Sequence, residues 1–319
     1  MTISEMHSLN PITPGDTIGI VAPASPFDKD RFESGIRFLE NQGFRLRIPE
    51  EIFHHAGFLA GSDAQRARLI NELFADSGVH AIWCARGGYG SLRILPLIDY
   101  GLIRAHPKPF IGSSDITALL AALSERCDMP VFHGPMIVSF ADADEASCRA
   151  AIEIFEMPGG WTVKADPVHV IRPGRGSGPV AGGNLTTLAH LIGTPFEPDF
   201  SGKLLFIEDI GEAPYRIDRM LTQFKMAGKL AHVQGVILGN FINCGPPEEI
   251  HAIAEEIFSD LSVPVLGGMP AGHGPGNMML PMGVEAVLDA GSGTLTYHSR
   301  FFHKTLKAAG KATPDAGLA

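Results

Sequence analysis

Short apolar runs alternate along the first third of the chain with longer segments in which apolar residues recur every three or four positions. The short runs predict buried strands, and the longer segments predict amphipathic helices. The predicted strands are residues 16–23, 44–48 and 79–85, and the predicted helices are residues 31–42 and a segment that opens at Ser62 and Asp63. Strands that alternate with helices predict an α/β domain whose parallel sheet carries helices on both faces.

The second half of the chain repeats this alternation, with predicted strands at 203–207, 233–239, 284–288 and 295–297 and predicted helices at 185–191 and 215–225. Residues 141–178 are predicted to be a connection, because one helix near 145–155 is followed by sequence rich in proline and glycine. The pattern therefore predicts an N-terminal parallel-sheet α/β domain over residues 1–165 and a smaller C-terminal α/β domain over residues 178–307. Residues 308–319 are small and polar and predict a frayed tail.

The stretch FIGSSDIT, from Phe110 to Thr117, joins a predicted strand to the start of a helix. A sharp strand-to-helix turn lifts the residue at the bend clear of the sheet and places it beside the free N–H groups of the helix N-terminus. A nucleophilic serine needs this placement. The pattern resembles such an elbow at Ser114, although Ile116 replaces its second glycine. The alternative is that Ser113 or Ser114 simply caps the helix.

A glycine-rich loop, Arg86–Ser91 (RGGYGS), follows the predicted strand at 79–85. Its three glycines allow a backbone to approach a ligand closely, and ligand sites of open α/β sheets gather at the carboxyl ends of strands. The loop is interpreted as an oxyanion hole, a phosphate cradle or a plain tight turn. The sequence lacks the P-loop lysine and the full dinucleotide-binding spacing, which counts against the phosphate cradle.

Further candidate groups lie in the second half of the chain. Glu208 and Asp209 end a predicted strand, and His273 stands between two glycines. Ser114, Glu208 and His273 match a nucleophile, an acid that orients the base, and the base itself. The acid can instead cap a helix or form a salt bridge, and His273 can be a turn residue. His133 follows the apolar pair Val131-Phe132 and is interpreted as a buried structural histidine rather than a chemical group.

Composition narrows the function classes. The net charge of −10, with no run of lysine or arginine, disfavours nucleic acid and anionic membranes as partners. The N-terminus lacks the pattern of a signal peptide, and no apolar run reaches the roughly 18 residues of a membrane span. The four cysteines show no paired spacing, so we expect reduced thiols in a cytoplasmic protein. No histidine pair has the H-E-x-x-H spacing of a metal site, and we expect neither a metal nor a cofactor.

Seven segments in order resemble the LD-carboxypeptidases of the serine peptidase S66 family, which also includes microcin-C self-immunity peptidases. They are PGDTIGIVAPASP, ARGGYGSLRILPLIDY, FIGSSDITAL, FHGPM, GGNLTTLAHLIGTP, LLFIEDIGEAPYRIDRMLTQ and GHGPGNMMLPMG. The resemblance implies a nucleophile at Ser114, an acid at Glu208 and a histidine at His273. It also implies an oxyanion hole formed by the backbone N–H of Asp115 and that of Gly87 or Gly88. The resemblance further implies that the site lies between the two domains and that the protein is a homodimer.

The activity that this resemblance implies is hydrolysis of the amide between an L-centred diamino acid, diaminopimelate or lysine, and a terminal D-alanine. The substrate would be a murein tetrapeptide, a small peptide recovered in cell-wall recycling, with Arg86 as a candidate partner for its carboxylate or as a structural residue. An immunity-type amidase that cleaves a peptidyl-nucleotide with the same triad is the alternative. A non-catalytic α/β ligand-binding protein is the alternative from another class.

Overall fold

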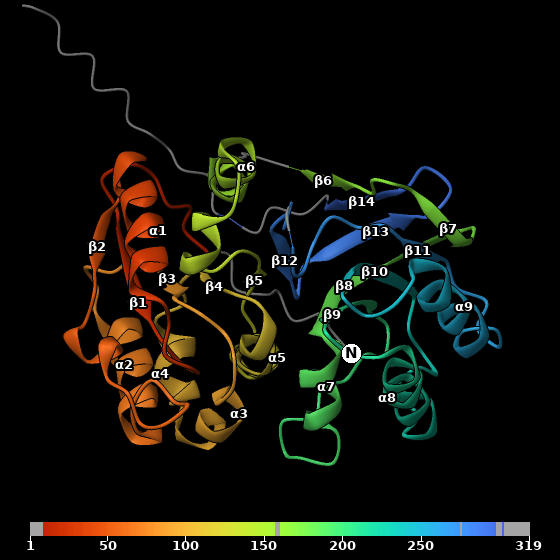
Figure 1. Ribbon diagram of the computed structural model, residues 1–319, viewed down its shortest axis with the longest axis horizontal. Coiled ribbons are helices and arrows are strands. Elements are labelled where there is room, and N and C mark those ends of the chain that lie inside the picture. The colour runs from red at the N-terminus through yellow and green to blue at the C-terminus, as the bar shows by residue number, and fades with distance from the viewer. Residues whose placement is uncertain (1–8, 157–159, 275, 298–301, 303–319) are drawn as a thin grey trace, which may run out of the picture.

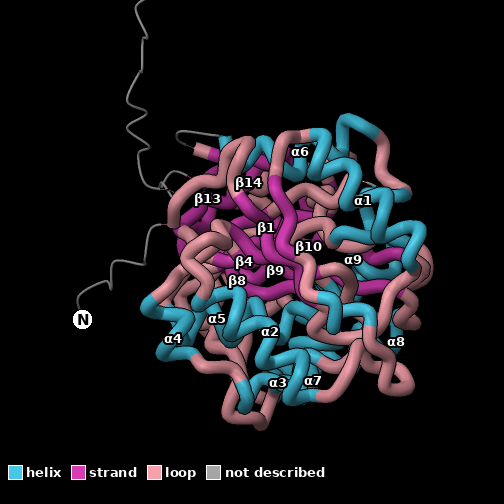
Figure 2. Tube along the Cα trace, turned by 90° about the vertical axis from the view of Figure 1, so that its left-hand side faces the viewer, coloured by secondary structure: helices cyan, strands magenta, loops and turns pink. Residues whose placement is uncertain are grey.

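The computed structural model describes residues 9–156, 160–274, 276–297 and 302, and these form two β-sheets with helices around them (Figure 1). The first sheet is built mostly from the N-terminal half of the chain and the second mostly from the C-terminal half. The two lie side by side in Figure 1, and Figure 2 shows the strands in the interior with helices towards the outside. The mixed α/β class predicted from the hydrophobic pattern is therefore confirmed.

The first sheet has the strand order β12-β5-β4-β3-β1-β2. Its five N-terminal strands are parallel, and only β12, at the edge, runs antiparallel to its neighbour. The strands are β1 (Thr17–Val21), β2 (Arg45–Arg47), β3 (Ala81–Cys84), β4 (Phe110–Gly112), β5 (Val131–His133) and β12 (Leu280–Met282). Most of these strands are apolar because helices cover both faces of a parallel sheet.

Several helices of this half begin at residues whose side chains cap them. Asp28 accepts a hydrogen bond from the backbone N–H of Arg31 at the start of α1, and Ser62 accepts one from Gln65 at the start of α2. The helices are α1 (Lys29–Asn41), α2 (Asp63–Ala75), α3 (Ser91–Ile94), α4 (Tyr100–Ala105), α5 (Thr117–Cys127) and α6 (Glu145–Glu156).

The second sheet has the strand order β6-β14-β13-β8-β9-β10-β11-β7. Strands β8 to β11 are parallel, and the strands on either side of them are antiparallel. The strands are β6 (Trp161–Lys164), β7 (His169–Arg172), β8 (Arg175–Asn184), β9 (Leu204–Ile210), β10 (Gly235–Ile242), β11 (Val265–Gly267), β13 (Glu285–Asp289) and β14 (Thr294–Tyr297). The helices of this half are α7 (Leu185–Leu191), α8 (Pro214–Met226) and α9 (Pro247–Ile257), the last of which was not predicted from the sequence.

The prediction that residues 141–178 form a connection is wrong in its second part, which contains β6, β7 and the start of β8. Strand β8 holds four glycines and a proline, residue types that are depleted in strands. The glycines are needed because the neighbouring backbone is very close: a Cβ on Gly182 would lie 1.8 Å from the carbonyl oxygen of Phe206 in β9. A composition typical of loops therefore marks a tightly packed strand here.

Two strands cross the domain boundaries predicted from the sequence. Strand β6 precedes residue 165 but pairs with β14 in the second sheet, and β12 lies beyond residue 178 but pairs with β5 in the first sheet. The domain ranges 1–165 and 178–307 stay a prediction. The frayed tail predicted at residues 308–319 lies outside the described residues. The crossing of β12 is important for the site, because the loop that precedes it ends beside the first sheet.

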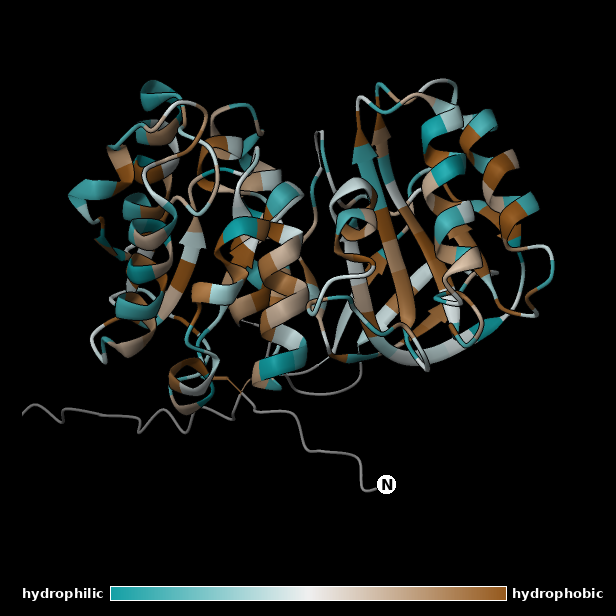
Figure 3. Ribbon diagram, turned by 90° about the horizontal axis from the view of Figure 1, so that it is seen from below, coloured by the Kyte–Doolittle hydropathy of each residue, from teal (hydrophilic) through white to brown (hydrophobic). Residues whose placement is uncertain are grey.

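The apolar strands lie between helices that carry polar residues on their outer sides (Figure 3). The largest fully buried side chains include Trp83 and Phe110 in the first sheet and Phe206 in the second. Within the described part of the chain, no helix has the length and apolar character that a membrane crossing requires. Both sheets therefore have ordinary buried cores, and they place the ends of β4 and β9 at the boundary between the two halves.

Candidate active site

The turn between β4 and α5 has the geometry of a sharp strand-to-helix elbow. Strand β4 ends at Gly112, a short 3-10 helix covers Ser114–Ile116, and α5 begins at Thr117. Ser114 has a φ of 59°, in the left-handed region that residues other than glycine rarely adopt. Such strain costs on the order of 1–3 kcal/mol and is typical of functional sites. The side chain of Ser114 is half-buried, whereas Ser113 before it is buried.

The glycine loop after β3 packs directly against this turn. A Cβ on Gly87 would lie 2.9 Å from Ser114 Cβ, 3.2 Å from Ser114 Oγ and 3.4 Å from the backbone nitrogen of Asp115. The backbone of Gly87 and the N–H of Asp115 thus border the same small space beside the Ser114 hydroxyl. Asp115 lies in the first turn of its helix, where N–H groups have no partner within the helix.

Several hydrogen bonds hold the glycine loop in place. The backbone N–H of Ser25 donates to the Gly87 carbonyl at 3.1 Å, and the Tyr89 N–H donates to Ser25 Oγ at 3.1 Å. The Asp115 carboxylate accepts from the Ser91 N–H at 2.8 Å, and the buried Arg66 donates to the Gly90 carbonyl at 3.0 Å. The loop is therefore a rigid part of the site, as an oxyanion hole requires.

Glu208 and His273 form a hydrogen-bonded pair. Glu208 lies near the end of β9 and is fully buried, and its Oε2 accepts from His273 Nδ1 at 2.7 Å and from the His273 backbone N–H at 3.0 Å. Because the pairing uses Nδ1, the other ring nitrogen, Nε2, is left for proton transfer. This is the arrangement in which a carboxylate fixes the tautomer and orientation of a general base.

The pair shifts the pKa of both partners. Burial by itself raises the pKa of the Glu208 carboxyl, but the hydrogen bond and charge of His273 outweigh it, and the pKa lies below its ordinary value. Burial by itself lowers the pKa of His273, but the hydrogen bond and charge of Glu208 outweigh it, and the pKa lies above its ordinary value. The site therefore stabilises an imidazolium next to a carboxylate.

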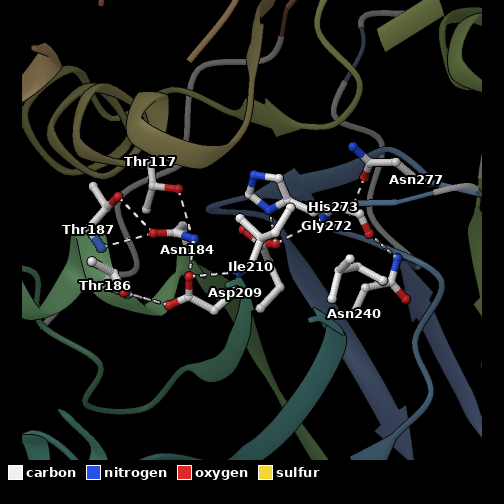
Figure 4. Close-up of polar contacts among 12 residues, drawn as sticks. Thr117, Asn184, Thr186, Thr187, Asp209, Ile210, Asn240, Gly272, His273 and Asn277 are labelled. Carbon is white, nitrogen blue, oxygen red and sulfur yellow. Dashed lines mark hydrogen bonds and ion pairs between the residues drawn. The ribbon is translucent and has the colours of Figure 1, made fainter. Parts of the chain in front are cut away.

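The loop that carries His273 is fixed by two asparagines (Figure 4). Asn240 Nδ2 donates to the His273 carbonyl at 2.8 Å, and Asn277 Oδ1 accepts from the Gly272 N–H at 2.9 Å. Neither residue was predicted from the sequence, because an asparagine that holds a loop has no characteristic spacing. The two bonds hold the backbone at His273 and at the residue before it.

Asp209, next to Glu208, has a separate structural role. Its carboxylate accepts hydrogen bonds from Asn184 Nδ2 at 3.0 Å and from the Thr186 hydroxyl at 2.8 Å, at the start of α7. The Asn184 backbone N–H in turn donates to Thr117 Oγ1 at 3.0 Å, in the first turn of α5 (Figure 4). Neighbouring strand residues point to opposite faces of a sheet. Glu208 is therefore the acid that meets the histidine, while Asp209 joins the second sheet to the helix that follows Ser114.

A cavity of about 510 Å³ lies beside the elbow, with Ser113 and His273 in its wall. It is lined by residues of both halves, and Arg31 and Asp142, which form an ion pair, are its charged side chains. Such a volume fits a small peptide or a ligand of similar size. Apolar side chains such as Met136 and Phe140 share the wall with this ion pair, so the cavity combines apolar and polar surface.

The predicted residues are not all brought into direct contact. Within the described residues, no hydrogen bond joins Ser114 to His273, and the cavity wall includes Ser113 of the elbow and His273 but not Ser114. Arg86 is exposed and donates to the Pro26 carbonyl at 2.6 Å, and it does not line the cavity. A Cβ on Gly88 would meet the Ser25 hydroxyl instead of Ser114, which favours Gly87 as the oxyanion-hole residue.

No group of three histidine, cysteine or carboxylate side chains suited to holding a metal ion occurs among the residues with a described position. The four cysteines are all buried and free. The absence of a metal or cofactor remains an expectation from the sequence.

Two family models match this chain, one in each half. Residues 18–134 match the family description "LD-carboxypeptidase N-terminal domain" of Peptidase_S66, and residues 177–288 match its "LD-carboxypeptidase C-terminal domain". The probable murein peptide carboxypeptidase of Bacillus subtilis is 38% identical over 304 residues, which covers 92% of this chain and 95% of that protein.

Two solved structures have a similar fold over nearly the whole chain. The muramoyltetrapeptide carboxypeptidase of Oxalobacter formigenes superposes with a TM-score of 0.80 at 32% identity, covering 89% of this chain and 99% of that one. The microcin C7 self-immunity protein MccF in complex with aspartyl sulfamoyl adenosine superposes with a TM-score of 0.85 at 26% identity, covering 93% of this chain and 100% of that one.

Proposed function

The chain belongs to the LD-carboxypeptidase family of S66 peptidases, and from this premise we propose that it is a serine LD-carboxypeptidase acting on murein tetrapeptides. The observation that carries the proposal is the buried Glu208–His273 pair beside a strained serine turn. The bond to be cleaved is the amide between an L-centred diamino acid and the terminal D-alanine. The 38% identity to a probable murein peptide carboxypeptidase supports this substrate class.

In the proposed reaction, Ser114 Oγ attacks the carbonyl carbon of the scissile amide while His273 Nε2 accepts the hydroxyl proton. The resulting oxyanion accepts hydrogen bonds from the backbone N–H groups of Asp115 and Gly87. His273 then returns the proton to the amine of the departing D-alanine, and the C–N bond breaks. Water, activated by the same imidazole, hydrolyses the acyl-enzyme, and Glu208 stabilises the imidazolium in both steps.

The wall of the cavity supports a small zwitterionic substrate. Arg31 is the cation that lines it, and Asp142 provides an opposite charge next to it. We therefore place a substrate carboxylate near Arg31, which lines the cavity, rather than near Arg86, which does not; the substrate would compete with Asp142 and the Val138 carbonyl for the Arg31 guanidinium. A guanidinium binds carboxylates through charge-assisted hydrogen bonds, which fix orientation as well as contributing affinity.

Stereochemistry gives the sharpest test of the proposed substrate. A tetrapeptide ending in D-alanine and its L-alanine epimer exchange the places of the terminal methyl and carboxylate. A pocket that holds the carboxylate forces the methyl of the wrong epimer into the wall or lifts the carbonyl from the oxyanion hole. A misplacement of ~1 Å costs on the order of a hundredfold in rate. We expect D-alanine release at least that much faster than L-alanine release, measured at equal substrate concentration.

Two outcomes of that measurement would contradict the proposal. Comparable rates for the two epimers would leave a general serine peptidase. Cleavage of an aminoacyl-sulfamoyl nucleotide, with neither tetrapeptide cut, would favour an immunity-type amidase. The second possibility is retained because MccF, whose structure holds aspartyl sulfamoyl adenosine, superposes at a TM-score of 0.85. The ligand-binding alternative is tested with a phosphonate probe, which labels Ser114 only if the serine is an activated nucleophile.

Gly87→Ala tests the proposed oxyanion hole. Gly87 does not have the left-handed φ that excludes alanine, yet the new methyl would lie 2.9 Å from Ser114 Cβ and occupy the space beside the hydroxyl. We expect kcat/KM to fall by roughly a hundredfold or more, with little change in the thermal unfolding temperature. Gly101→Ala is the matched control, because its methyl would meet only Asp99 Oδ1 at 3.4 Å. Full activity of Gly87→Ala would remove this loop from the catalytic machinery.

We further propose, on the family resemblance, a cytoplasmic homodimer. Sedimentation equilibrium of the purified chain tests the oligomeric state, and a monomer at micromolar concentration would contradict it.

A further inference from the structure

A second histidine, His133, lies on the far side of the acid from His273. It ends β5, in register with Gly112 of β4 and Leu280 of β12, and it is fully buried. Its ring packs edge-on against Phe206 of β9, with 5.1 Å between the ring centroids. The first sheet therefore brings this imidazole to the strand that carries Glu208.

Polar atoms on both sides of this contact lack partners. Within the described residues, His133 Nδ1, His133 Nε2 and Glu208 Oε1 are buried and have no hydrogen bond. An unsatisfied buried polar atom costs roughly 1–3 kcal/mol, and more when the group is charged. The second oxygen of Glu208, Oε2, already accepts both bonds from His273. The unpaired oxygen is thus the one that faces His133.

The distance between the two unpaired groups is short. His133 Nε2 lies 3.9 Å from Glu208 Oε1. An approach of about 1 Å, within the reach of a small ring rotation, brings them to the usual N–H···O distance. That one movement satisfies the buried carboxylate oxygen and one of the two imidazole nitrogens.

The protonation state of His133 suits a donor. Burial lowers the pKa of its imidazole to about 4, so that the ring is neutral at neutral pH and carries a single N–H. The titratable groups that act on this cluster are Glu208, His273 and, more remotely, Asp209. A neutral donor orients a carboxylate without competing with His273 for its charge.

We propose that His133 is a positioning residue, whose Nε2–H donates to Glu208 Oε1 and holds the carboxylate so that Oε2 faces His273 Nδ1. The proposal rests on the proposed function of Ser114, Glu208 and His273 as a triad. It extends the chain of hydrogen bonds to a fourth side chain, supplied by the opposite sheet. Among the described residues that line the cavity, His133 does not appear.

This role has a consequence that a merely structural role lacks. A hydrogen bond donated to Glu208 stabilises the carboxylate, which then stabilises the protonated form of His273 less strongly. Loss of the donor makes the carboxylate a stronger partner, so the pKa of His273 rises. It also loosens the carboxylate, and the base loses its alignment with Ser114.

The test compares His133→Phe with His133→Gln, whose amide can place an N–H near the position of Nε2. For His133→Phe we expect kcat on the tetrapeptide to fall roughly 10- to 100-fold, with KM changed less than about twofold and the acid limb of the kcat/KM profile moved to higher pH. For His133→Gln we expect kcat to stay close to the wild-type value and the acid limb of the kcat/KM profile to lie at the wild-type pH. The control is Val131→Ala, which creates a cavity at a fully buried position of the same strand. It lowers stability without moving the limb.

Histidine-selective ¹⁵N NMR of the whole chain gives a readout that needs no substrate. We expect His133 as the Nε2–H tautomer across neutral pH and an upward shift of the His273 titration in His133→Phe. A His133 Nδ1–H tautomer, or a His273 titration unchanged in His133→Phe, would overturn the proposal even if the enzyme is active. Inactivity of the wild type on every tetrapeptide, with these NMR results as expected, would instead count against the proposed substrate alone.

Discussion

Ser114→Ala is expected to lower turnover by roughly four or more powers of ten, because members of a catalytic triad act as a unit. Without Oγ, the imidazole of His273 has no hydroxyl to deprotonate, and only the oxyanion hole and substrate binding remain. The fold is expected to survive. Ser114 is half-buried at a turn, and alanine removes a single oxygen from a residue with a φ of 59°. The measurement is single-turnover hydrolysis of the tetrapeptide, with thermal unfolding of the same sample.

Ser113→Ala is the matched control for this substitution. Ser113 is the neighbouring hydroxyl, is buried and lines the cavity, so its loss tests whether any serine of the turn is enough. We expect Ser113→Ala to keep activity within about tenfold of the wild type. If Ser114→Ala kept more than a tenth of the activity, the nucleophile would lie elsewhere, and Ser113 would be the first residue to consider.

The parts of the fold that the sequence predicted are those whose local pattern matches their burial. Most parallel strands of the first sheet are short apolar runs, β2 (Arg45–Arg47) being the exception, and helices α1 and α2 have apolar spacing together with side-chain caps at Asp28 and Ser62. Strand β8 was missed because its composition is set by close backbone contact, and the Cβ position at Gly182 is filled by the Phe206 carbonyl. The pairing of β12 with β5 depends on the tertiary fold, which no local pattern contains.

The residues of the candidate site were likewise predicted where a local pattern marks them and missed where their role depends on tertiary contacts. Ser114, Glu208 and His273 were indicated by position at turns and strand ends and by the family resemblance, and the structure brings Glu208 and His273 into contact. Arg86 was chosen from the sequence for its place beside the glycine loop, but its guanidinium is bound to Pro26, whereas Arg31, 55 positions earlier, lines the cavity. Roles that depend on contacts between the two sheets, such as that proposed for His133, have no signature along the chain.

Glu208→Gln is expected to lower kcat by roughly a thousandfold or more, since a triad in which an amide replaces the carboxylate holds the wrong tautomer. The glutamine side chain is similar in size, but it has an NH₂ group where the wild type has only acceptors. If that group faces His273 Nδ1, the ring can no longer present an N–H there, and Nε2 becomes protonated and cannot act as a base. The charge that stabilises the imidazolium is lost as well.

The pH profile separates this effect from simple unfolding. His273 must be neutral to accept the serine proton, so kcat/KM falls as the pH drops through the pKa of His273. In the wild type Glu208 holds that pKa above its ordinary value of 6.5, and the acid limb is expected above pH 6.5. Without the carboxylate, burial lowers the pKa instead, so the limb of Glu208→Gln is expected to move to lower pH.

Glu212→Gln is the comparison that makes this assignment falsifiable. Glu212 lies four residues further on, before α8, and its carboxylate accepts from Arg216 at 3.3 Å as an ion pair on the helix surface. Surface pairs of this kind contribute about 0–1 kcal/mol to stability and none of the geometry of the site. We expect Glu212→Gln to keep nearly full activity and the wild-type acid limb. Equal losses of kcat from the two substitutions would mean that the orienting acid is not Glu208.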